Sequence, residues 1–323
     1  MRSRPVRAGT ELLAWIATVA GATGIALHFS RSSARLLVLA ASVAPYLMCS
    51  AVVAAVTFTV LRRRSGAAAA VIVAALGVWT QVPLYAGDSG AGSGPELTVM
   101  QANLLFEGAD PRALVEEVRA RRVTILTVNE LTPAALGELT LAGLDHLLPH
   151  RYVSPGRTAT GTGIYSAYPL TDTVEYDGYV LNQLSATATV PGAGPVTVYA
   201  FHPVPPIYGT DVWSDELSRL RAILDRAPGD RPAIAGGDFN ATFDHSQFRA
   251  MLSGRFHDAA EQSGAGHLVT YPTDKAFPPL IGIDHILLAG AHATRVATVA
   301  LPGADHRALV ADLRLASAVQ PRQ

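Results

Sequence analysis

The sequence has little cysteine and little lysine. Its only cysteine is Cys49, so no disulfide forms within the chain, and a small fold held by disulfides is excluded. That one cysteine carries no information about the compartment. Lysine is equally scarce, with Lys275 alone beside 24 arginines. Hydrophobic residues make up 49% of the 323 residues, which excludes a disordered chain and argues against a single fully soluble domain.

The net charge of −1 conceals two segments of opposite sign. Residues 1–95 hold eight arginines and two acidic residues, whereas residues 96–323 hold 17 basic and 24 acidic residues. The basic segment is also the more apolar one. We therefore expect two parts that lie in different surroundings.

Three long apolar runs without a charged side chain occupy the first segment: Leu12–Phe29, Leu36–Leu61 and Ala67–Ala86. A helix needs roughly 20 apolar residues to cross a bilayer, so residues 1–86 are predicted to form an anchor of three transmembrane helices, at about 12–29, 36–61 and 67–86. A cleavable signal peptide is an alternative for the first run. Buried core helices are an alternative for all three, although core helices are rarely apolar on every face.

The distribution of arginine predicts the orientation of this anchor in the cell membrane. Three arginines precede the first run and three more, Arg62–Arg64, separate the second from the third, but only two lie in the first link. The positive-inside rule therefore places the N-terminus in the cytoplasm and the chain after residue 86 outside it. The Gly- and Ser-rich segment 87–95 is predicted to be a flexible linker that reaches about 15–18 Å.

Strand-like and helix-like segments alternate from residue 96 to about residue 315, which predicts an α/β domain with mixed sheets. Residues 316–323 are expected to form a tail. The expected helices are Pro111–Arg121, Pro133–Leu141, Asp211–Ala227 and Ser246–Leu252. The expected strands are Leu97–Ala102, Val123–Val128, Gly163–Ala167, Val196–Phe201, Ala233–Ala235, Ile283–Ala289, Arg295–Ala300 and Ala308–Leu313.

Polar side chains capable of catalysis or metal binding lie where these strands begin or end. Each of them alone is more often a turn, cap or packing residue. The ordered set is the informative feature, and it consists of Asn103, Glu130, His202, Asp238, Asn240, Asp284, Asp305 and His306. Oxygen ligands without cysteine pairs suit a hard cation such as Mg²⁺ or Mn²⁺. Such a cation neutralises a phosphate group and lowers the pKa of water, so the set predicts hydrolysis of phosphate esters or anhydrides.

These motifs resemble the endonuclease/exonuclease/phosphatase superfamily of DNase I-like proteins over about residues 96–315. The strongest is Gly237–Asn240 (GDFN), followed by Asp305–Arg307 (DHR) and by Thr270–Pro272 (TYP) together with Ile283–Ile286 (IDHI). Gly161–Ser166 also matches a strand of that superfamily. The resemblance implies a four-layer α/β/β/α sandwich.

The resemblance also implies a role for each polar residue. Asn103 and Glu130 would hold Mg²⁺ (or Mn²⁺), and Asp305 would complete the acidic cluster. Leu105 stands where some members have an acidic residue, which makes a second metal site less favoured.

The remaining site residues would act on the substrate. Asp238 and Asn240 would orient the attacking water and the phosphoryl oxygens, and His306 would contact the phosphoryl group while Asp284 fixes its tautomer. His202 would face the phosphate or the leaving group. Whether Asp238 or His306 is the general base is left open, and His285 is expected to point away from the site.

The acidic charge of residues 96–323 and their predicted attachment to a membrane anchor favour a lipid substrate over nucleic acid. Proteins that follow a nucleic-acid backbone use lysine and arginine, yet residues 96–323 are acidic overall. Two apolar loops, Pro203–Tyr208 and Ala276–Gly282, flank the site motifs and are candidates for contact with the bilayer, although ordinary loop packing also explains them.

The whole architecture is similar to the membrane-anchored VanJ-type members of the superfamily. That similarity implies a phosphatase acting on undecaprenyl pyrophosphate or a related envelope lipid, with teicoplanin-type antibiotic resistance as its role. A membrane-anchored nuclease or phospholipid phosphodiesterase, and a non-catalytic membrane binding protein, are the alternatives.

Overall fold

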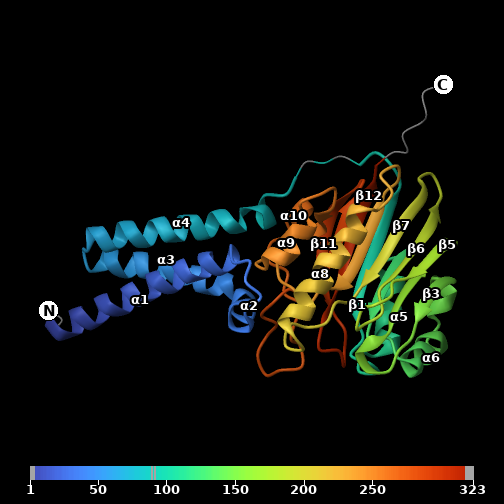
Figure 1. Ribbon diagram of the computed structural model, residues 1–323, viewed down its shortest axis with the longest axis horizontal. Coiled ribbons are helices and arrows are strands. Elements are labelled where there is room, and N and C mark those ends of the chain that lie inside the picture. The colour runs from blue at the N-terminus through green and yellow to red at the C-terminus, as the bar shows by residue number, and fades with distance from the viewer. Residues whose placement is uncertain (1–3, 89, 91, 317–323) are drawn as a thin grey trace.

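Three long helices project from one side of an α/β sandwich in the computed structural model, which describes residues 4–88, 90 and 92–316 (Figure 1). The projecting part contains α1 (Arg4–His28), α2 (Arg35–Ala41), α3 (Ala44–Val60) and α4 (Arg64–Ala86). Residues 89 and 91 of the expected linker, and residues 317–323 of the expected tail, lie outside the described residues.

Two of these helices, α1 and α4, are each long and apolar enough to cross a membrane. The prediction of one continuous span over residues 36–61 is wrong. The chain forms two helices there, α2 and α3, which meet at an angle of 66° and give a third crossing only if the bent pair is counted as one span. Pro45 lies in the first turn of α3. A proline lacks the N–H group that an uninterrupted helix would need, and its ring crowds the preceding turn, so the helix restarts there.

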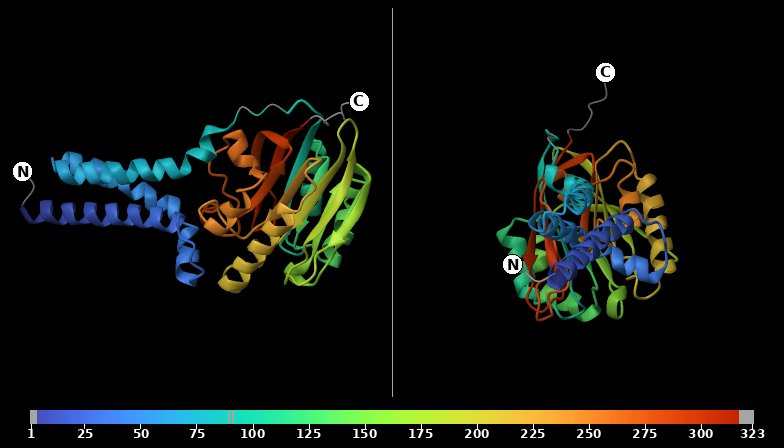
Figure 2. Two further views of the ribbon diagram at one scale, coloured as in Figure 1. Left: turned by 45° about the horizontal axis from the view of Figure 1, so that its top comes forward. Right: turned by 90° about the vertical axis from the view of Figure 1, so that its left-hand side faces the viewer.

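Helix α2 packs against the sandwich and does not follow the bundle. Val38 is only 2% exposed and belongs to the same apolar cluster as Trp213 and Phe248 of the sandwich, whereas Leu36 on the other side of α2 is 79% exposed. Figure 2 shows α2 turning sideways from the bundle toward the side on which the gold-coloured helices lie. The bend arises at Pro45, and packing on the domain determines the direction that α2 takes from it.

The sandwich contains two six-stranded mixed sheets. The first sheet has the order β11-β12-β1-β2-β4-β3, formed by β11 (Ala291–Ala300), β12 (Arg307–Leu315), β1 (Glu96–Asn103), β2 (Ile125–Asn129), β4 (Thr162–Ser166) and β3 (His150–Ser154). The second has the order β5-β6-β7-β8-β10-β9, formed by β5 (Leu170–Glu175), β6 (Leu184–Val190), β7 (Gly194–Phe201), β8 (Ala233–Asp238), β10 (Asp284–Ala289) and β9 (His257–Asp258).

Apolar side chains fill the space between the sheets and the space between each sheet and its helices. Val99 and Ile125 of the first sheet share one buried cluster with Val198 and Ile286 of the second. The outer face of the first sheet is covered by α5 (Pro111–Ala120), α6 (Pro133–Leu141) and α7 (Leu144–Leu147), and that of the second by α8 (Thr210–Asp225) and α9 (Ser246–Met251). The layers thus run helix, sheet, sheet, helix, and a short α10 (Ala259–Ser263) packs beside α4 and β11.

Strand direction brings the chemically important residues to one edge of the sandwich. Strands β1 and β2 are parallel, as are β7 and β8, so the ends of all four lie at this edge. Strands β10 and β12 run antiparallel to β8 and β1 respectively, so their beginnings lie there too, with Asp284 directly opposite Asp238.

Buried polar contacts join the anchor to the sandwich. The Asp244 carboxylate contacts His28 Nδ1 of α1 at 2.7 Å and accepts a hydrogen bond from Gln81 Nε2 of α4 at 3.0 Å. His245 Nε2 lies 2.9 Å from the Val38 carbonyl oxygen of α2. The domain is therefore held on the anchor by more than its covalent connection.

The described residues of the connecting segment are themselves hydrogen-bonded to the sandwich. Asp88 donates its N–H to the Gln262 carbonyl at 2.9 Å and contacts His292 through its carboxylate, also at 2.9 Å. Gly94 donates to the Leu315 carbonyl at 2.9 Å. Both ends of the expected flexible linker are thus fixed.

Candidate active site

The two sheets meet at the site through hydrogen bonds from Asn103, the last residue of β1. Its amide nitrogen donates to Glu130 Oε1 and to Asp238 Oδ2, both at 3.1 Å, and its carbonyl oxygen accepts from the Leu105 N–H at 3.0 Å. Glu130 follows β2, and its positive φ of 58° turns the chain so that its side chain reaches Asn103. Asp238 ends β8 and is 2% exposed.

Asn129 holds this corner together, although the sequence did not single it out. Its carbonyl oxygen accepts from Gln101 Nε2 at 2.7 Å and from the Asp238 N–H at 2.9 Å, and its amide nitrogen donates to the Phe201 carbonyl at 3.2 Å. Asn129 therefore links β1, β2, β7 and β8. No signal in the sequence distinguishes it, because it reads as one more polar residue beside Glu130.

His306 and Asp284 form a buried ion pair. His306 Nδ1 lies 2.8 Å from Asp284 Oδ2, and the ring packs against Tyr271 with 4.8 Å between centroids. Burial alone would lower the pKa of His306, but the negative charges of Asp284 and Asp238 outweigh it and raise this pKa to about 10. His306 is therefore a cation, and its other nitrogen, Nε2, faces Asp238 at 3.7 Å and Asp305 at 3.9 Å.

Asp238 lies between two histidines, of which His306 is charged and His202 is neutral. Its Oδ2 is 3.7 Å from Nε2 of both His306 and His202. Burial raises the pKa of Asp238 to about 7, against the lowering effect of the His306 charge. Burial and the charge on His306 lower the pKa of His202 to about 3, so His202 is neutral.

Two further residues hold these groups in place. Gln183 brackets the His202 backbone, accepting from its N–H at 2.7 Å and donating to its carbonyl at 2.6 Å. Nothing in the sequence indicates this contact. Asn240 donates its backbone N–H to Asp238 Oδ1 at 2.9 Å, while its side chain donates to the Pro203 carbonyl at 3.0 Å.

The structure thus connects all eight residues of the predicted set through contacts of 3.9 Å or less: Asn103, Glu130, His202, Asp238, Asn240, Asp284, Asp305 and His306. His285 points away from them, as expected, and contacts Asp258 at 2.7 Å and the Ala241 carbonyl at 2.9 Å.

The donor set at this edge fits a hard divalent cation. Three buried carboxylate oxygens there, Glu130 Oε2, Asp284 Oδ1 and Asp305 Oδ1, have no hydrogen-bond partner among the described residues. Burial raises the pKa of both Glu130 and Asp305, and the charge on His306 offsets this rise only in part. Asp238, Asp284 and His306 each offer one possible ligand atom, and these three atoms lie within 4.8 Å of one another. A protonated histidine cannot coordinate a metal, so only the two carboxylates of this group offer ligand atoms.

The comparisons with known proteins agree with this geometry. Residues 100–307 match the model of the endonuclease/exonuclease/phosphatase family. No curated protein matches the sequence.

Solved structures share the fold at low identity. The structure of D. rerio TDP2 with a single-stranded DNA product aligns with a TM-score of 0.58 at 16% identity, covering 68% of this chain and 98% of that one. An endonuclease/exonuclease/phosphatase from Beutenbergia cavernae aligns with a TM-score of 0.55 at 22% identity, covering 70% and 74%. One from Bacteroides vulgatus aligns with a TM-score of 0.56 at 17% identity, covering 68% and 99%. The family model spans most of the chain, and this protein therefore belongs to the endonuclease/exonuclease/phosphatase family.

Proposed function

We propose that this protein is a membrane-anchored, divalent-metal-dependent hydrolase that cleaves phosphate esters or anhydrides of a phosphorylated envelope lipid. The observation that carries the proposal is the buried cluster of acidic and histidine side chains in a domain docked on apolar helices. Mg²⁺ or Mn²⁺, held by Asn103, Glu130 and Asp305, would neutralise phosphate charge and lower the pKa of the attacking water.

The charge states of the site residues suggest their roles. Asp238, with its pKa near 7, is suited to accept a proton from water at neutral pH, so we assign it as the general base. His306 is a cation held by Asp284, so we assign it to stabilise negative charge on the phosphoryl oxygens. His202, which is neutral, is assigned to the phosphate or leaving-group side.

Contact between a site loop and the anchor supports a substrate from the bilayer. The Tyr46 hydroxyl, in the first turn of α3, donates to the Leu280 carbonyl at 2.6 Å. Leu280 belongs to the loop Ala276–Gly282, which precedes Asp284. Phe277 of this loop is 48% exposed, and Tyr208 of the second apolar loop is 65% exposed. An apolar lipid tail could lie against these side chains while its phosphate enters the site.

The arrangement of the helices supports an outward-facing domain. Helix α1 begins, and α3 meets α4, at the end of the bundle farthest from the sheets (Figure 1). Arg4 and Arg7 at the start of α1 and Arg62–Arg64 between α3 and α4 therefore lie at one end of the bundle, which the positive-inside rule assigns to the cytoplasm. On this basis we propose undecaprenyl pyrophosphate as the substrate, as in VanJ-type members, with teicoplanin-type resistance as the cellular consequence.

The lipid assignment is tested by removing the apolar loop side chains. A variant with Ile207, Tyr208, Phe277 and Leu280 replaced by Ser should lose about tenfold or more of its activity on a polyprenyl pyrophosphate, because several apolar contacts are lost. It should keep its activity on a soluble phosphate ester such as p-nitrophenyl phosphate. Equal loss on both substrates would show that the loops maintain the site and do not recognise lipid.

Nucleic acid is the competing substrate, because the structure of a TDP2 bound to a DNA product shares this fold. The acidic balance of residues 96–323 speaks against it. Nicking of supercoiled DNA by the wild type, with no hydrolysis of lipid pyrophosphate, would replace the lipid proposal with a membrane-anchored nuclease.

A further inference from the structure

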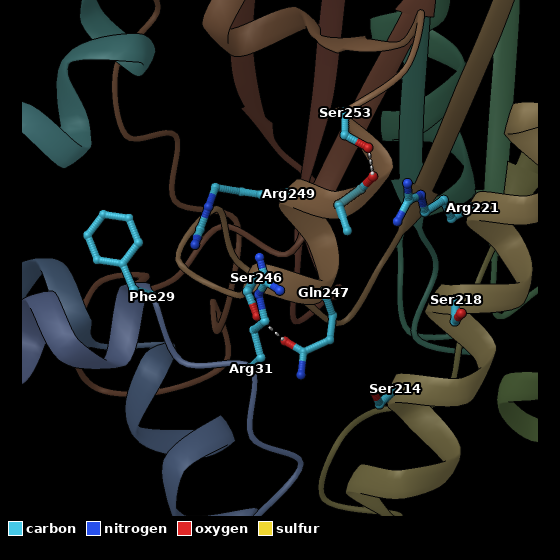
Figure 3. Close-up of a pocket in the computed structure, with 10 residues that line it drawn as sticks. Phe29, Arg31, Ser214, Ser218, Arg221, Ser246, Gln247, Arg249 and Ser253 are labelled. Atoms are coloured by element: carbon cyan, nitrogen blue, oxygen red, sulfur yellow. Dashed lines mark hydrogen bonds between the residues drawn. The ribbon is translucent and has the colours of Figure 1, made fainter.

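A polar cavity of about 610 Å³ lies where the anchor meets the sandwich (Figure 3). None of the eight site residues lines it. Its walls come from the segment after α1, from one face of α8 and from α9, and the polar lining residues are Arg31, Ser214, Ser218, Arg221, Ser246, Gln247, Arg249 and Ser253. Figure 3 shows Ser214, Ser218 and Arg221 along α8 on one side and Arg31, Ser246 and Gln247 on the other.

Three arginines give this cavity a positive charge within a domain that is otherwise acidic. The Arg249 guanidinium already donates hydrogen bonds within the protein, to the Phe243 carbonyl of the sandwich at 2.6 Å and to the His28 carbonyl of the anchor. Arg31 has no hydrogen-bond partner among the described residues, and Arg221 Nε is buried without one. The nearest acid is Asp225, whose carboxylate lies 3.6 Å from Arg221 Nε. Two guanidinium groups therefore have donors left for a ligand.

Hydroxyl groups on α8 add neutral donors to the same cavity. Ser214 and Ser218 are four residues apart and so lie one above the other on the helix surface. Neither side chain has a hydrogen-bond partner among the described residues. Guanidinium groups beside hydroxyl groups are the donors that proteins use for phosphate, because they match its oxygens with several charge-assisted hydrogen bonds.

Exposed aromatic side chains of the anchor lie beside the cavity. Phe29, which lines it and directly follows α1, is 54% exposed, and Trp79 of α4 is 63% exposed, with 6.4 Å between the two ring centroids. Exposed aromatic rings at the end of a spanning helix mark the interface between hydrocarbon and headgroups. Arg31 comes two residues after Phe29 and lines the same cavity, so a lipid whose acyl chains lie against the aromatic rings would bring its phosphate close to this guanidinium.

We propose that this cavity binds the phosphate group of an anionic membrane phospholipid, with Arg31 and Arg221 as the charged partners and Ser214 and Ser218 as hydrogen-bond donors. A lipid held there would contact α1, α8 and α9 together. It would thereby brace the catalytic domain on its anchor. The site is separate from the catalytic edge and does not depend on what substrate the enzyme cleaves.

The test measures the thermal stability of the full chain in a neutral detergent with three probes: dioctanoyl phosphatidylglycerol, dioctanoyl phosphatidylcholine and inorganic phosphate. Wild type should gain about 5 °C in Tm from phosphatidylglycerol at about one hundred times its Kd. Phosphatidylcholine and inorganic phosphate should give less than about one fifth of that rise, since neither offers a net negative charge together with acyl chains at the interface. The variant R31Q/R221Q should lose the response.

Two further variants keep the result interpretable. The variant R119Q/R121Q makes the same charge change on α5, where both arginines are paired with neighbouring glutamates, and should respond as the wild type does. The variant S218E leaves both arginines in place but adds a negative charge to the cavity wall, and should also lose the response. A full Tm rise in R31Q/R221Q or S218E would overturn the proposal. An equal rise with inorganic phosphate, or equal loss in R119Q/R121Q, would overturn the lipid assignment.

Discussion

Among the acidic neighbours that keep His306 charged, Asp284 contributes most. The two side chains are in contact at 2.8 Å, and both are almost fully buried. In such surroundings a carboxylate acts on a histidine far more strongly than it would in water. The proposed role of His306 as a fixed cation therefore rests mainly on Asp284.

Replacing Asp284 by Asn should lower the pKa of His306 from about 10, because the amide keeps the shape of the carboxylate but not its charge. Phosphate hydrolysis should fall by about 10²–10⁴-fold. NMR titration of the His306 ring, together with kcat, measures both effects.

The matched control is Asp258→Asn, which makes the same exchange beside His285, outside the site. It should leave kcat close to that of the wild type. An unchanged His306 pKa in Asp284→Asn would show that Asp284 does not determine its charge.

The charged groups of the site could be predicted from the sequence, but the residues that hold them in position could not. Asp238, Asp284 and His306 stand out because each lies at the end of an apolar strand. Asn129 and Gln183 act through backbone contacts with residues distant in the chain, at Phe201 and His202. Such contacts depend on which strands become neighbours, and that is decided only by the folded sheets.

The strands that carry the site could be predicted because they are buried on both faces and therefore read as apolar runs. Strands β2, β8 and β10 are buried along their whole length. Four strands were not predicted: β3, β5, β6 and β9. Of these, β5 is almost entirely exposed, and β6 alternates small and polar residues in LSATATV. The bend at Pro45 was missed because hydropathy alone does not record a proline.

The two sheets pack so closely at Gly236 of β8 that only glycine fits there. A Cβ atom there would lie 2.3 Å from Thr127 Oγ1 of the facing sheet, and Thr127 is buried and hydrogen-bonded to Gln101 Oε1 at 2.5 Å. Gly236→Ala should therefore destabilise the protein by about 1–3 kcal/mol and displace the strand end that carries Asp238. Thermal or denaturant unfolding measures the change.

Gly137→Ala is the control for that substitution. Gly137 lies in α6, and an added Cβ would meet nothing within 4 Å. Because alanine favours a helix more than glycine does, this variant should gain up to about 1 kcal/mol. Equal stability of both variants would contradict the close approach of the sheets.

In the whole molecule, the anchor and the catalytic domain behave as one unit because polar groups are buried between them. His245 is the pH-sensitive part of this interface. Thr242 donates its N–H to His245 Nδ1 at 2.9 Å, so Nε2 carries the proton and donates to the Val38 carbonyl. Both contacts require the neutral ring, and burial lowers the pKa of His245 to about 4.

Acidification should therefore weaken the docked structure. In the unfolded chain His245 takes up a proton near its ordinary pKa of 6.5, whereas in the folded chain it does so only near pH 4. The contribution of neutral His245 to the free energy of unfolding is therefore fully present above pH 6.5 and is lost as the pH falls toward 4. The loss is on the order of 3 kcal/mol. Glu261, whose pKa burial raises to about 7, has the opposite dependence, so a variant is needed to isolate His245.

His245→Asn provides that comparison, because Asn can accept from Thr242 but does not titrate. Tm in detergent, followed from pH 7 to pH 4, should fall less steeply in the variant than in the wild type. Parallel curves would show that His245 does not govern the acid sensitivity of the docked molecule.

Release of inorganic phosphate from a polyprenyl pyrophosphate in detergent, measured with and without Mg²⁺, tests whether this protein is a metal-dependent lipid pyrophosphatase. Wild type and His306→Ala are compared, each with Mg²⁺ and with EDTA. We predict release by the wild type with Mg²⁺ and none in the other three reactions. No release by the wild type, or equal release by His306→Ala, would contradict the claim.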